Sequence, residues 1–381
     1  MNIRSLRLDN FRNYERLSLN LSDGINFFSG PNAAGKTNLL EAVYLLATGR
    51  SLRAMKHGEM IRWGADWMYL KAIVEAKAGD LEIEVAVNQE GKSSKINGVN
   101  SKRIHELLGN LRVVFFSPDE IALVKGPPVV RRKYIDLQIS QVSKAYYRFA
   151  LLYYRLLGQK NAYLKDHNGS SVDSKLLDSW DEALASTGSQ LMAARFKALQ
   201  ALAENSSRYV GEMTGDREKF HIAYVPSVNL NLQELLRDGQ GGITRLQAEL
   251  QAAIKESRSV ELARRVSVVG PHRDDLRFEL DGKDLRAYGS QGQQRTAVLA
   301  LKLAEVDFIS EATGDTPVLL LDDVFSELDE TRRGLLLKVL SGKIQSMITS
   351  TDPLTNDAQT VFRKAACYTV GGGRVIPAAP W

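Results

Sequence analysis

The sequence predicts an α/β fold: a mixed sheet with helices and an antiparallel β subdomain, interrupted by an inserted all-helical lobe. β-type patterns dominate the N-terminal third, apolar residues at helical spacing dominate the middle, and β-type patterns return towards the C-terminus. A chain of 381 residues is long enough for two domains, or for one domain with a large insertion. We place the boundaries so that residues 1–128 and 263–381 form the α/β body and residues 129–262 form the lobe.

The N-terminal part contains several expected strands. Leu17, Leu19 and Leu21 alternate with polar residues, as in a half-buried strand. The Asn97-Gly98 pair is typical of a two-residue hairpin turn. The other expected strands are apolar or alternating runs at residues 3–11, 24–28, 69–76, 81–87 and 111–116.

The middle of the chain predicts helices that pack on one another. After Pro127-Pro128, apolar residues recur every three or four positions, which indicates helical stripes. We expect helices of at most about 25–35 residues, or about 40–50 Å at the helical rise. Loops are expected at residues 168–171 and 238–242. The three stripes are Ile135, Ile139, Val142, Tyr146, Phe149, Tyr153 and Leu156; Leu177, Trp180, Leu184 and Leu191; and Ile243, Leu246 and Leu250.

The C-terminal part returns to α/β character. A strand is expected at residues 266–269, and a helix after Gln291. Residues 318–321 are fully apolar, as in a strand buried on both faces, and they end at Asp322-Asp323. From Gly371 onwards the chain is expected to form a turn and a frayed end.

The composition is that of an ordinary soluble protein, with 44% hydrophobic and 25% charged residues. No apolar run approaches the roughly 20 residues that span a bilayer, and the N-terminus lacks a signal-peptide pattern. The single cysteine cannot form an internal disulfide, so we expect a cytoplasmic location and no membrane partner. The net charge of +5 permits a polyanionic partner without demanding one. Residues 131–160 contain seven basic residues and one acid, Asp136, which fits either a nucleic-acid contact or a solvated helix face.

A glycine-rich segment matches the phosphate-binding pattern G-x-x-x-x-G-K-[ST] at every fixed position. It follows an apolar strand and opens a helix, so backbone N–H groups and the helix dipole would surround phosphate oxygens. We expect Lys36 to neutralise the β and γ phosphates of ATP and to act in catalysis, and Thr37 to bind Mg²⁺. The expected ATP-binding residues of this segment are Gly30, Pro31, Asn32, Ala33, Ala34, Gly35, Lys36, Thr37 and Asn38.

The apolar strand at residues 318–321 is the expected partner of this phosphate-binding loop. Its terminal Asp322 would reach Mg²⁺, directly or through water. The next residue, Asp323, would orient and deprotonate the attacking water as the catalytic base. By itself, an apolar run that ends in two aspartates is a weak signal.

Two further motifs narrow the class to ABC-type ATPases. Ser290, Gln291, Gly292 and Gln293 resemble the ABC signature at the start of a helix, where N–H groups could hold a γ-phosphate. That phosphate belongs to the ATP of a second copy, so an ATP-dependent homodimer is expected. Ser326 and Asp329 fit the D-loop that follows the catalytic carboxylate. The four motifs in order predict a P-loop ABC-type ATPase head, although the signature alone could be a polar helix cap.

The chain resembles the RecF family of DNA recombination-repair ATPases, relatives of the structural-maintenance-of-chromosomes (SMC) heads. The resemblance implies ATP-dependent binding of double-stranded DNA at gap junctions and slow, DNA-stimulated hydrolysis. It also implies RecR, with RecO, as a partner and RecA loading as the outcome. By the same resemblance Arg12 lies near the nucleotide; an exposed surface arginine is the alternative. The similarity covers essentially the whole chain and is carried by residues 8–14, 30–38, 116–119, 124–126, 131–136, 270–275, 290–295 and 321–329.

The chain departs from the wider ABC pattern at three points. Asp323 stands where a catalytic glutamate is usual, which suits slow turnover. The switch histidine is absent, and residues 349–352 (Thr-Ser-Thr-Asp) take its place. No Q-loop glutamine is found near residues 116–119.

Two other polar segments have open interpretations. Arg131, Arg132 and Lys133 begin a helix, where positive charge opposes the dipole, so a DNA-phosphate contact is predicted. Residues 272–275 (His-Arg-Asp-Asp) form either a network around the nucleotide site or a structural ion-paired turn.

Three alternative functions share some of these motifs. A transporter ATPase would normally keep the switch histidine and lack the long helical lobe. A chromosome-organising head without a repair role would usually carry a coiled coil of hundreds of residues. The third alternative is a scaffold in which ATP controls partner binding and hydrolysis is incidental.

Overall fold

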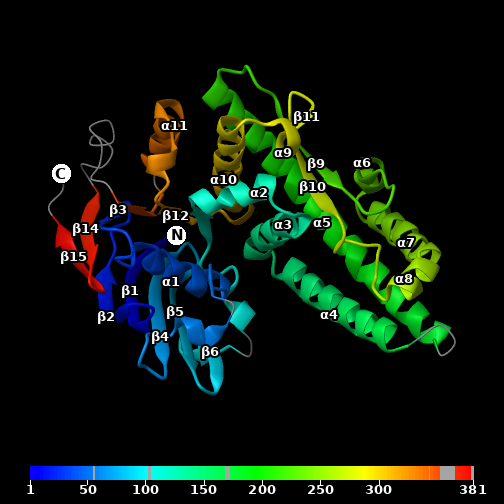
Figure 1. Cartoon of the computed structure of the whole chain (residues 1–381), viewed down its shortest axis with the longest axis horizontal. Helices are drawn as coiled ribbons and strands as arrows, with labels where there is room; N and C mark the ends of the chain where they lie inside the picture. The colour runs from blue at the N-terminus through cyan, green and yellow to red at the C-terminus, as the bar shows by residue number, and fades with distance from the viewer. Residues whose placement is uncertain (55, 102–103, 168–171, 343, 352–364, 379–381) are drawn as a thin grey trace. The chain divides into compact units, whose positions relative to one another are not determined.

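The computed structural model describes residues 1–54, 56–101, 104–167, 172–342, 344–351 and 365–378 (Figure 1). The chain divides into two compact units. The α/β unit consists of Met1–Glu120, Gly211–Asp216 and Val298–Trp381, and the helical unit of Ile121–Val210 and Arg217–Ala297. The helical unit begins at Ile121, eight residues before the expected start of the lobe at residue 129, and residues 263–297 group with the helical unit.

The α/β unit is built around a mainly parallel sheet in the order β15-β14-β3-β13-β12-β8. All neighbouring strands are parallel except β14 and β15. β12 is buried at every position, which explains its continuous apolar sequence. Because the strands are parallel, the loops after β3, β12 and β13 leave the same edge of the sheet. The strands are β3 (Ile25–Ser29), β8 (Val113–Phe116), β12 (Val318–Asp322), β13 (Ser346–Ser350), β14 (Ala366–Gly371) and β15 (Arg374–Ala378).

An antiparallel sheet in the order β2-β1-β4-β5-β6-β7 forms the expected β subdomain of the same unit. Buried and more exposed positions alternate along β4 and β5, so one face of the sheet is apolar. Asn97 and Gly98 both have positive φ values, 50° and 75°, and form the predicted hairpin turn. The strands are β1 (Asn2–Phe11), β2 (Tyr14–Asn20), β4 (Met68–Ala76), β5 (Gly79–Asn88), β6 (Gly91–Ile96) and β7 (Val99–Asn100).

Helix α1 (Lys36–Thr48) joins the two sheets into one core. It contacts β4 and β5 of the antiparallel sheet and β8, β12 and β13 of the parallel sheet. Its leucines Leu39, Leu40, Leu45 and Leu46 are fully buried, because the helix is covered on several sides. The helix ends at Gly49, whose left-handed conformation allows its N–H to bond the carbonyl of Leu45.

The helical unit contains the expected long helices, with two corrections. The predicted stripe from Ile135 to Leu156 spans two helices, α3 (Pro128–Val142) and α4 (Lys144–Asp166), because Ser143 leaves the helical conformation and caps α4. Its side chain accepts a hydrogen bond from the N–H of Tyr146. Helix α5 (Ser174–Thr214) is 41 residues long, which exceeds the predicted limit.

Three other expectations for this region differ from the structure. Residues 266–269 form no strand, because the N–H groups of Ser267 and Val268 bond to side chains of Asn161 and Glu261. The expected loop at residues 238–242 is mostly helical, since α7 (Gln240–Glu256) begins within it. β9 (Phe220–Val225), which was not predicted, pairs with β10 (Asp275–Leu280). The expected loop at residues 168–171 lies outside the described residues.

The remaining elements are short, apart from α10 and α11. The described part of the chain contains no helix long and apolar enough to cross a membrane. These elements are η1 (His57–Met60), η2 (Ile104–Leu107), η3 (Pro118–Ile121), α2 (Ala122–Lys125), α6 (Leu232–Leu235), η5 (Leu236–Asp238), α8 (Arg258–Arg264), β11 (Lys283–Asp284), α9 (Leu285–Tyr288), α10 (Gln291–Thr313), η6 (Phe325–Glu327) and α11 (Glu330–Leu340).

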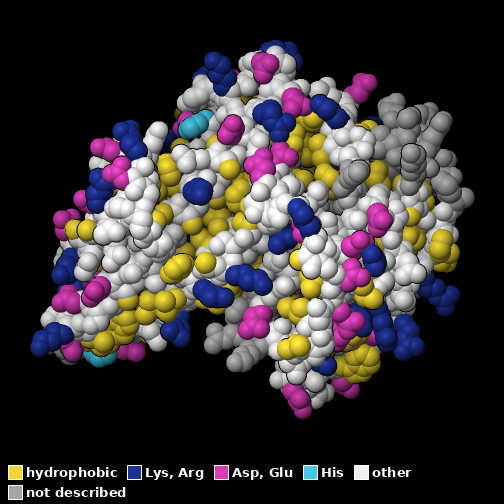
Figure 2. Space-filling view, turned by 180° about the vertical axis from the view of Figure 1, so that it is seen from behind, with side chains coloured by type: hydrophobic (Ala, Val, Ile, Leu, Met, Phe, Trp, Pro, Cys, Tyr) yellow, Lys and Arg dark blue, Asp and Glu magenta, His cyan; other side chains and the backbone are white. Residues whose placement is uncertain are grey.

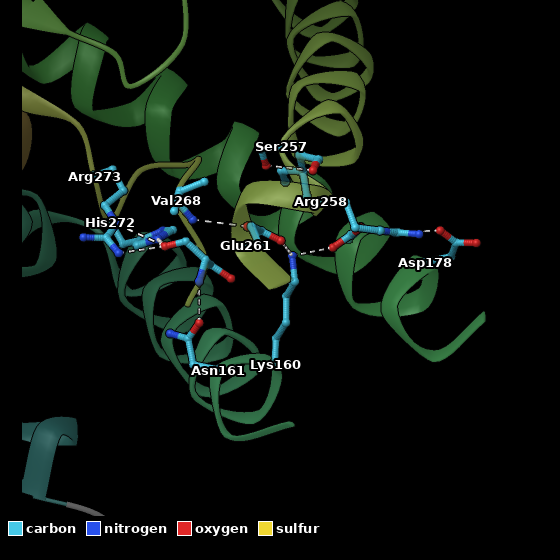
Figure 3. A network of polar contacts seen from close by, with 12 residues as sticks. Lys160, Asn161, Asp178, Ser257, Arg258, Glu261, Val268, His272 and Arg273 are labelled. Carbon is cyan, nitrogen blue, oxygen red and sulfur yellow. Dashed lines mark hydrogen bonds and ion pairs between the residues drawn. The ribbon is translucent and has the colours of Figure 1, made fainter. Parts of the chain in front are cut away.

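A buried charge network connects α4, α5 and α8 within the helical unit (Figure 3). The Lys160 ammonium lies 2.7 Å from a carboxylate oxygen of Asp181 and 2.6 Å from one of Glu261. The side chains of all three residues are at most 2% exposed. Arg258 pairs with Asp181 as well, and reaches the half-exposed Asp178 at 2.8 Å.

Candidate nucleotide-binding site

The predicted phosphate-binding loop lies between β3 and α1, as the motif requires. Gly35 has a φ of 108°, and an added Cβ would lie 2.3 Å from the side-chain amide of Asn13. At Gly30 a Cβ would lie 2.2 Å from the carbonyl oxygen of Val370. Both glycines of the motif are therefore required by the close approach of neighbouring chain segments, and the match is not a chance one.

The turn between β1 and β2 supports this loop from the side. The Asn13 amide donates to the carbonyl of Ala34 at 2.9 Å, and the buried Tyr14 hydroxyl donates to the carbonyl of Gly35 at 2.9 Å. Asn38 donates to the Asn13 side-chain oxygen at 2.9 Å. No role was predicted for Asn13 or Tyr14, although both belong to the segment that carries the family resemblance.

Lys36 bends back over the loop. Its ammonium donates to the carbonyl oxygens of Gly30 at 2.7 Å and Pro31 at 2.9 Å. Burial lowers the pKa of Lys36, while the carboxylates of Asp323 and Asp322 act in the opposite direction. Lys36 is thus held where the loop, the helix N-terminus and both aspartates meet, as expected for a phosphate-binding lysine.

Thr37 and Asp322, predicted as metal ligands, are brought together from 285 positions apart in the sequence. The Thr37 hydroxyl lies 2.9 Å from each carboxylate oxygen of Asp322. A hydroxyl and a carboxylate fit Mg²⁺, which prefers oxygen ligands. The described residues contain no cluster of three or more His, Cys, Asp or Glu side chains that could hold a metal. A Mg²⁺ ion here would therefore need phosphate or water oxygens as further ligands.

Asp323, the predicted catalytic base, follows directly in an unusual conformation. Its φ is 53°, and its N–H bonds both to the carbonyl of Thr349 at 3.2 Å and to the Thr349 hydroxyl at 3.1 Å. Its carboxylate oxygen Oδ1 is buried and has no hydrogen-bond partner among the described residues. One carboxylate oxygen of Asp323 thus has unused hydrogen-bonding capacity, and the left-handed backbone is held in place by β13.

Thr349 belongs to the segment that replaces the switch histidine. Its hydroxyl donates to Asp322 at 2.7 Å, and its side chain is fully buried. The sequence indicated where this segment lies but assigned no contact to Thr349. Asp352, the last residue of the segment, lies outside the described residues.

Arg12 is engaged in an ion pair within the α/β unit. Its guanidinium forms two hydrogen bonds with Glu41 of α1, at 2.9 and 2.8 Å, and donates to the Glu59 carbonyl at 2.7 Å. The side chain is only 20% exposed, so the alternative of a freely exposed surface arginine does not hold. Its contact with nucleotide stays a prediction.

The signature motif forms a helix cap at the start of α10. The Ser290 hydroxyl accepts from the N–H of Gln293 at 3.2 Å, and the Gln293 side chain accepts from the N–H of Ser290 at 2.9 Å. This reciprocal pair is a capping box. Gln293 also donates to Glu218 at 2.8 Å. Ser290 and Gln291 remain exposed, so capping and a contact with another subunit are compatible.

The predicted D-loop residues are both exposed and lie after β12. The Ser326 hydroxyl donates to the carbonyl of Asp323 at 2.9 Å. Asp329 caps α11 by accepting from the N–H of Arg332 at 3.0 Å. These contacts fix the course of the chain after the two aspartates.

The predicted DNA contact at Arg131 needs correction. Arg131 is 3% exposed and forms hydrogen bonds to Asp275 at 2.7 and 2.8 Å, so its charge is used inside the helical unit. Arg132 is partly buried and donates to the carbonyl of Asp274 at 2.7 Å. Lys133 is exposed and is the member of the group that could contact a phosphate.

Residues 272–275 form a structural turn in the helical unit, which favours the second of their two interpretations. Burial lowers the pKa of His272 to about 4, and its ring nitrogens bond to the Tyr153 hydroxyl and the Ser267 carbonyl. Asp274 accepts hydrogen bonds from Tyr224 and from the N–H of Ser227. These polar groups therefore hold neighbouring segments of the unit together.

Charged side chains of both signs lie side by side over the face drawn in Figure 2, without a large field of one sign. This distribution matches the small excess of 50 basic over 45 acidic residues. Any contact with nucleic acid on this face would therefore depend on a limited number of exposed cations.

The parallel sheet, the phosphate-binding loop, the Thr37–Asp322 pair and the antiparallel subdomain define an ABC-type ATPase head. The family model described as "RecF/RecN/SMC N terminal domain" matches residues 2–366. The chain belongs to the RecF family. The "DNA replication and repair protein RecF" of Symbiobacterium thermophilum is 44% identical over 92% of each chain, and that of Geobacillus thermodenitrificans is 38% identical over the full length of both.

Solved structures agree with this assignment. The structure named "recombination mediator protein RecF-ATPrS in RecFOR pathway" has a TM-score of 0.89 at 34% identity, covering 99% of this chain and 98% of that one. An Smc head bound to the C-winged helix domain of ScpA has a TM-score of 0.58 at 15% identity. The latter likeness concerns the fold alone.

Proposed function

We propose that this chain is an ATP-dependent DNA-binding protein of recombinational repair and replication. ATP closes two copies into a dimer that clamps duplex DNA near single-strand gaps. With RecO and RecR, the closed dimer assists the loading of RecA. Slow, DNA-stimulated hydrolysis of ATP then reopens the clamp.

The contact between Thr37 and Asp322 is the observation that carries this proposal. It joins the loop that would hold the phosphates to the strand that would hold Mg²⁺. When bound, Mg²⁺ would neutralise developing negative charge on the transferred phosphoryl group. Lys36 would hold the phosphates, and the Asp323 carboxylate would orient and accept a proton from the attacking water.

Homology supports the repair role and the partners. The relatives that cover essentially the whole chain are named for DNA replication and repair, and the solved relatives are named for ATP and for the RecFOR pathway. In the closed dimer, Ser290 and the N-terminus of α10 would contact the ATP of the other copy. Contacts with DNA would be made mainly to phosphates and hence would be weakly sequence-specific, and Lys133 is a candidate for one of them.

Two alternatives share the same site. A chromosome-organising head would have the fold without the repair role, but the longest described helix has 41 residues, far short of an SMC coiled coil. A scaffold would use ATP only to control partner binding. The scaffold predicts that Asp323→Asn, which blocks proton transfer, leaves repair unchanged, whereas the clamp predicts a repair defect.

Sedimentation of the full chain with and without ATP and short duplex DNA tests the clamp. The wild type should form a DNA-bound dimer only with ATP, and Lys36→Met should remain monomeric. Lys338→Met is a matched control, because its side chain is 75% exposed in a surface ion pair, and it should behave as wild type. If wild type and Lys36→Met bind DNA equally as monomers, the gated clamp is excluded.

A further inference from the structure

The strand order places β13 between the two motif-bearing strands of the parallel sheet. β13 pairs with β3, which leads into the phosphate-binding loop, and with β12, which ends at Asp322. Thr349 lies opposite Asp322 in this register. Its buried side chain is therefore adjacent to the proposed metal ligand, at the edge where the loops converge.

The Thr349 hydroxyl has one proton to donate, and Asp322 is the acceptor with the shorter distance. That bond is 2.7 Å long, whereas the distance to the carbonyl of Leu321 is 3.4 Å. The same oxygen accepts from the N–H of Asp323 at 3.1 Å. A chain of hydrogen bonds thus runs from the backbone of Asp323, through Thr349, to the carboxylate of Asp322, and each bond polarises the next.

We propose that Thr349 is a positioning residue for the magnesium–nucleotide site: it orients the Asp322 carboxylate and holds the Asp323 backbone beside it. The inference deepens the proposed function and rests on it. Among the described residues, the side chains that donate to the Asp322 carboxylate are Thr37 and Thr349. When the Thr37 hydroxyl binds a metal ion, Thr349 is the donor left to fix the carboxylate.

A valine side chain at position 349 would have nearly the shape of threonine but could neither donate nor accept a hydrogen bond. In Thr349→Val, the N–H of Asp323 keeps its second partner, the carbonyl of residue 349 at 3.2 Å. The backbone of the site should therefore persist, while the carboxylate of Asp322 loses a charge-assisted hydrogen bond. The loss should affect the Mg²⁺-dependent part of nucleotide binding and leave the Mg²⁺-independent part intact.

The test is equilibrium binding of a fluorescent ATP analogue to the full chain, in EDTA and across a Mg²⁺ titration. In EDTA, Thr349→Val should bind the analogue with an affinity within about twofold of wild type. In the titration, Mg²⁺ raises the affinity for the analogue, and the Mg²⁺ concentration that gives half of this gain should be about tenfold higher for the variant, equivalent to about 1.4 kcal/mol. Thr349→Ser, which keeps the hydroxyl, should return this value to within about twofold of wild type. Thr349→Ala repeats the test if the valine variant does not fold.

Thr48→Val is the matched control. Thr48 is also buried in the α/β unit and both donates and accepts hydrogen bonds through its hydroxyl. It lies at the far end of α1, whose 13 residues span about 20 Å from the phosphate-binding end. This variant should melt at a lower temperature than wild type and keep the wild-type Mg²⁺ requirement.

Three outcomes would overturn the inference. The first is an unchanged Mg²⁺ requirement in Thr349→Val. The second is an equal loss of affinity in EDTA and in Mg²⁺, which would indicate a structural role only. The third is the same shift in Thr48→Val. If the wild type binds no nucleotide under any condition, the proposed function fails first and the inference fails with it.

Discussion

Replacing Lys160 by methionine should strongly destabilise the helical unit. Lys160 is 1% exposed and pairs with the buried carboxylates of Asp181 and Glu261, and Figure 3 shows the contact with Glu261. Methionine preserves most of the volume but removes the positive charge. Asp181 keeps its partner Arg258, whereas among the described residues the Glu261 carboxylate keeps one hydrogen bond, from the N–H of Val268 at 3.2 Å.

The expected loss follows from leaving Glu261 as a buried, unpaired charge. Breaking a buried ion pair from one side typically costs about 3–5 kcal/mol. For a domain of 150–250 residues, each kcal/mol lowers the melting temperature by about 2–4 °C, so a decrease of about 6–20 °C is expected. Arg245→Met provides the comparison. Arg245 pairs with Asp238, both side chains are more than half exposed, and its loss should cost less than about 1 kcal/mol.

Urea unfolding followed by circular dichroism measures both variants. The double variant Lys160→Met/Glu261→Gln separates the unpaired charge from lost packing. Because glutamine is neutral, the double variant should recover about 2 kcal/mol relative to Lys160→Met alone. A loss below about 1 kcal/mol in Lys160→Met, or no recovery in the double variant, would refute the argument that the burial of unpaired charge dominates.

Three further outcomes are expected. Asp323→Asn should lower the ATP hydrolysis rate about 100-fold or more, measured by phosphate release, while ATP-dependent dimerisation persists; an unchanged rate would exclude Asp323 as the base. Burial lowers the pKa of His272 to about 4 from its ordinary 6.5, so the unfolded chain binds a proton more readily than the folded chain. The contribution of His272 to the free energy of unfolding is therefore complete above pH 6.5 and falls by about 3 kcal/mol as the pH decreases to 4. The urea midpoint of His272→Gln, measured across this pH range, should lack this part of the decrease. If the midpoints of wild type and variant fall in parallel with pH, His272 is not the cause. Lys133→Glu should weaken DNA binding and reduce its salt dependence in a salt titration. Arg131→Met should lower the melting temperature and leave the salt dependence of DNA binding unchanged. If instead Arg131→Met reduces the salt dependence and Lys133→Glu does not, Arg131 contacts a DNA phosphate after all.

Local patterns were sufficient for much of the α/β unit. The strands β4, β5 and β12, the hairpin at Asn97-Gly98 and the position of the loop before α1 are confirmed. In each case the signal lies within a few consecutive residues: alternation, a positive-φ pair, or glycines at fixed spacing. The close contacts of Gly30 and Gly35 explain why the loop cannot carry side chains at these positions.

The helical unit was less predictable because its irregular segments depend on distant partners. Residues 266–269 have an apolar, strand-like composition, yet their N–H groups bond to side chains from α4 and α8. The short strand β9 depends on its pairing with β10, about 50 residues later. Ser143 ends one helix and caps the next, although the apolar spacing continues across it.

Arg131 illustrates the limits of charge patterns. A basic cluster at a helix start suggested a phosphate contact, because such charges oppose the helix dipole. In the structure, Asp275 supplies the compensating charge, from a strand 144 positions later in the chain. No pattern in the sequence indicated that Arg131 and Asp275 would form an ion pair.

The sequence motifs named several residues that the structure brings together at the candidate site, but they did not indicate how those residues are arranged in space. Motifs specify chemical groups, and the sheet order β3-β13-β12 decides which of them are neighbours. β13 follows β12 in the sequence and is inserted between β12 and β3 in space. Only this insertion brings Thr349 to the Asp322 carboxylate, so a residue in the segment that lacks the switch histidine acquires a direct contact with the proposed metal ligand. The absence of a histidine therefore does not leave this strand without a role: its threonine connects the two aspartates on which metal binding and water activation are proposed to depend.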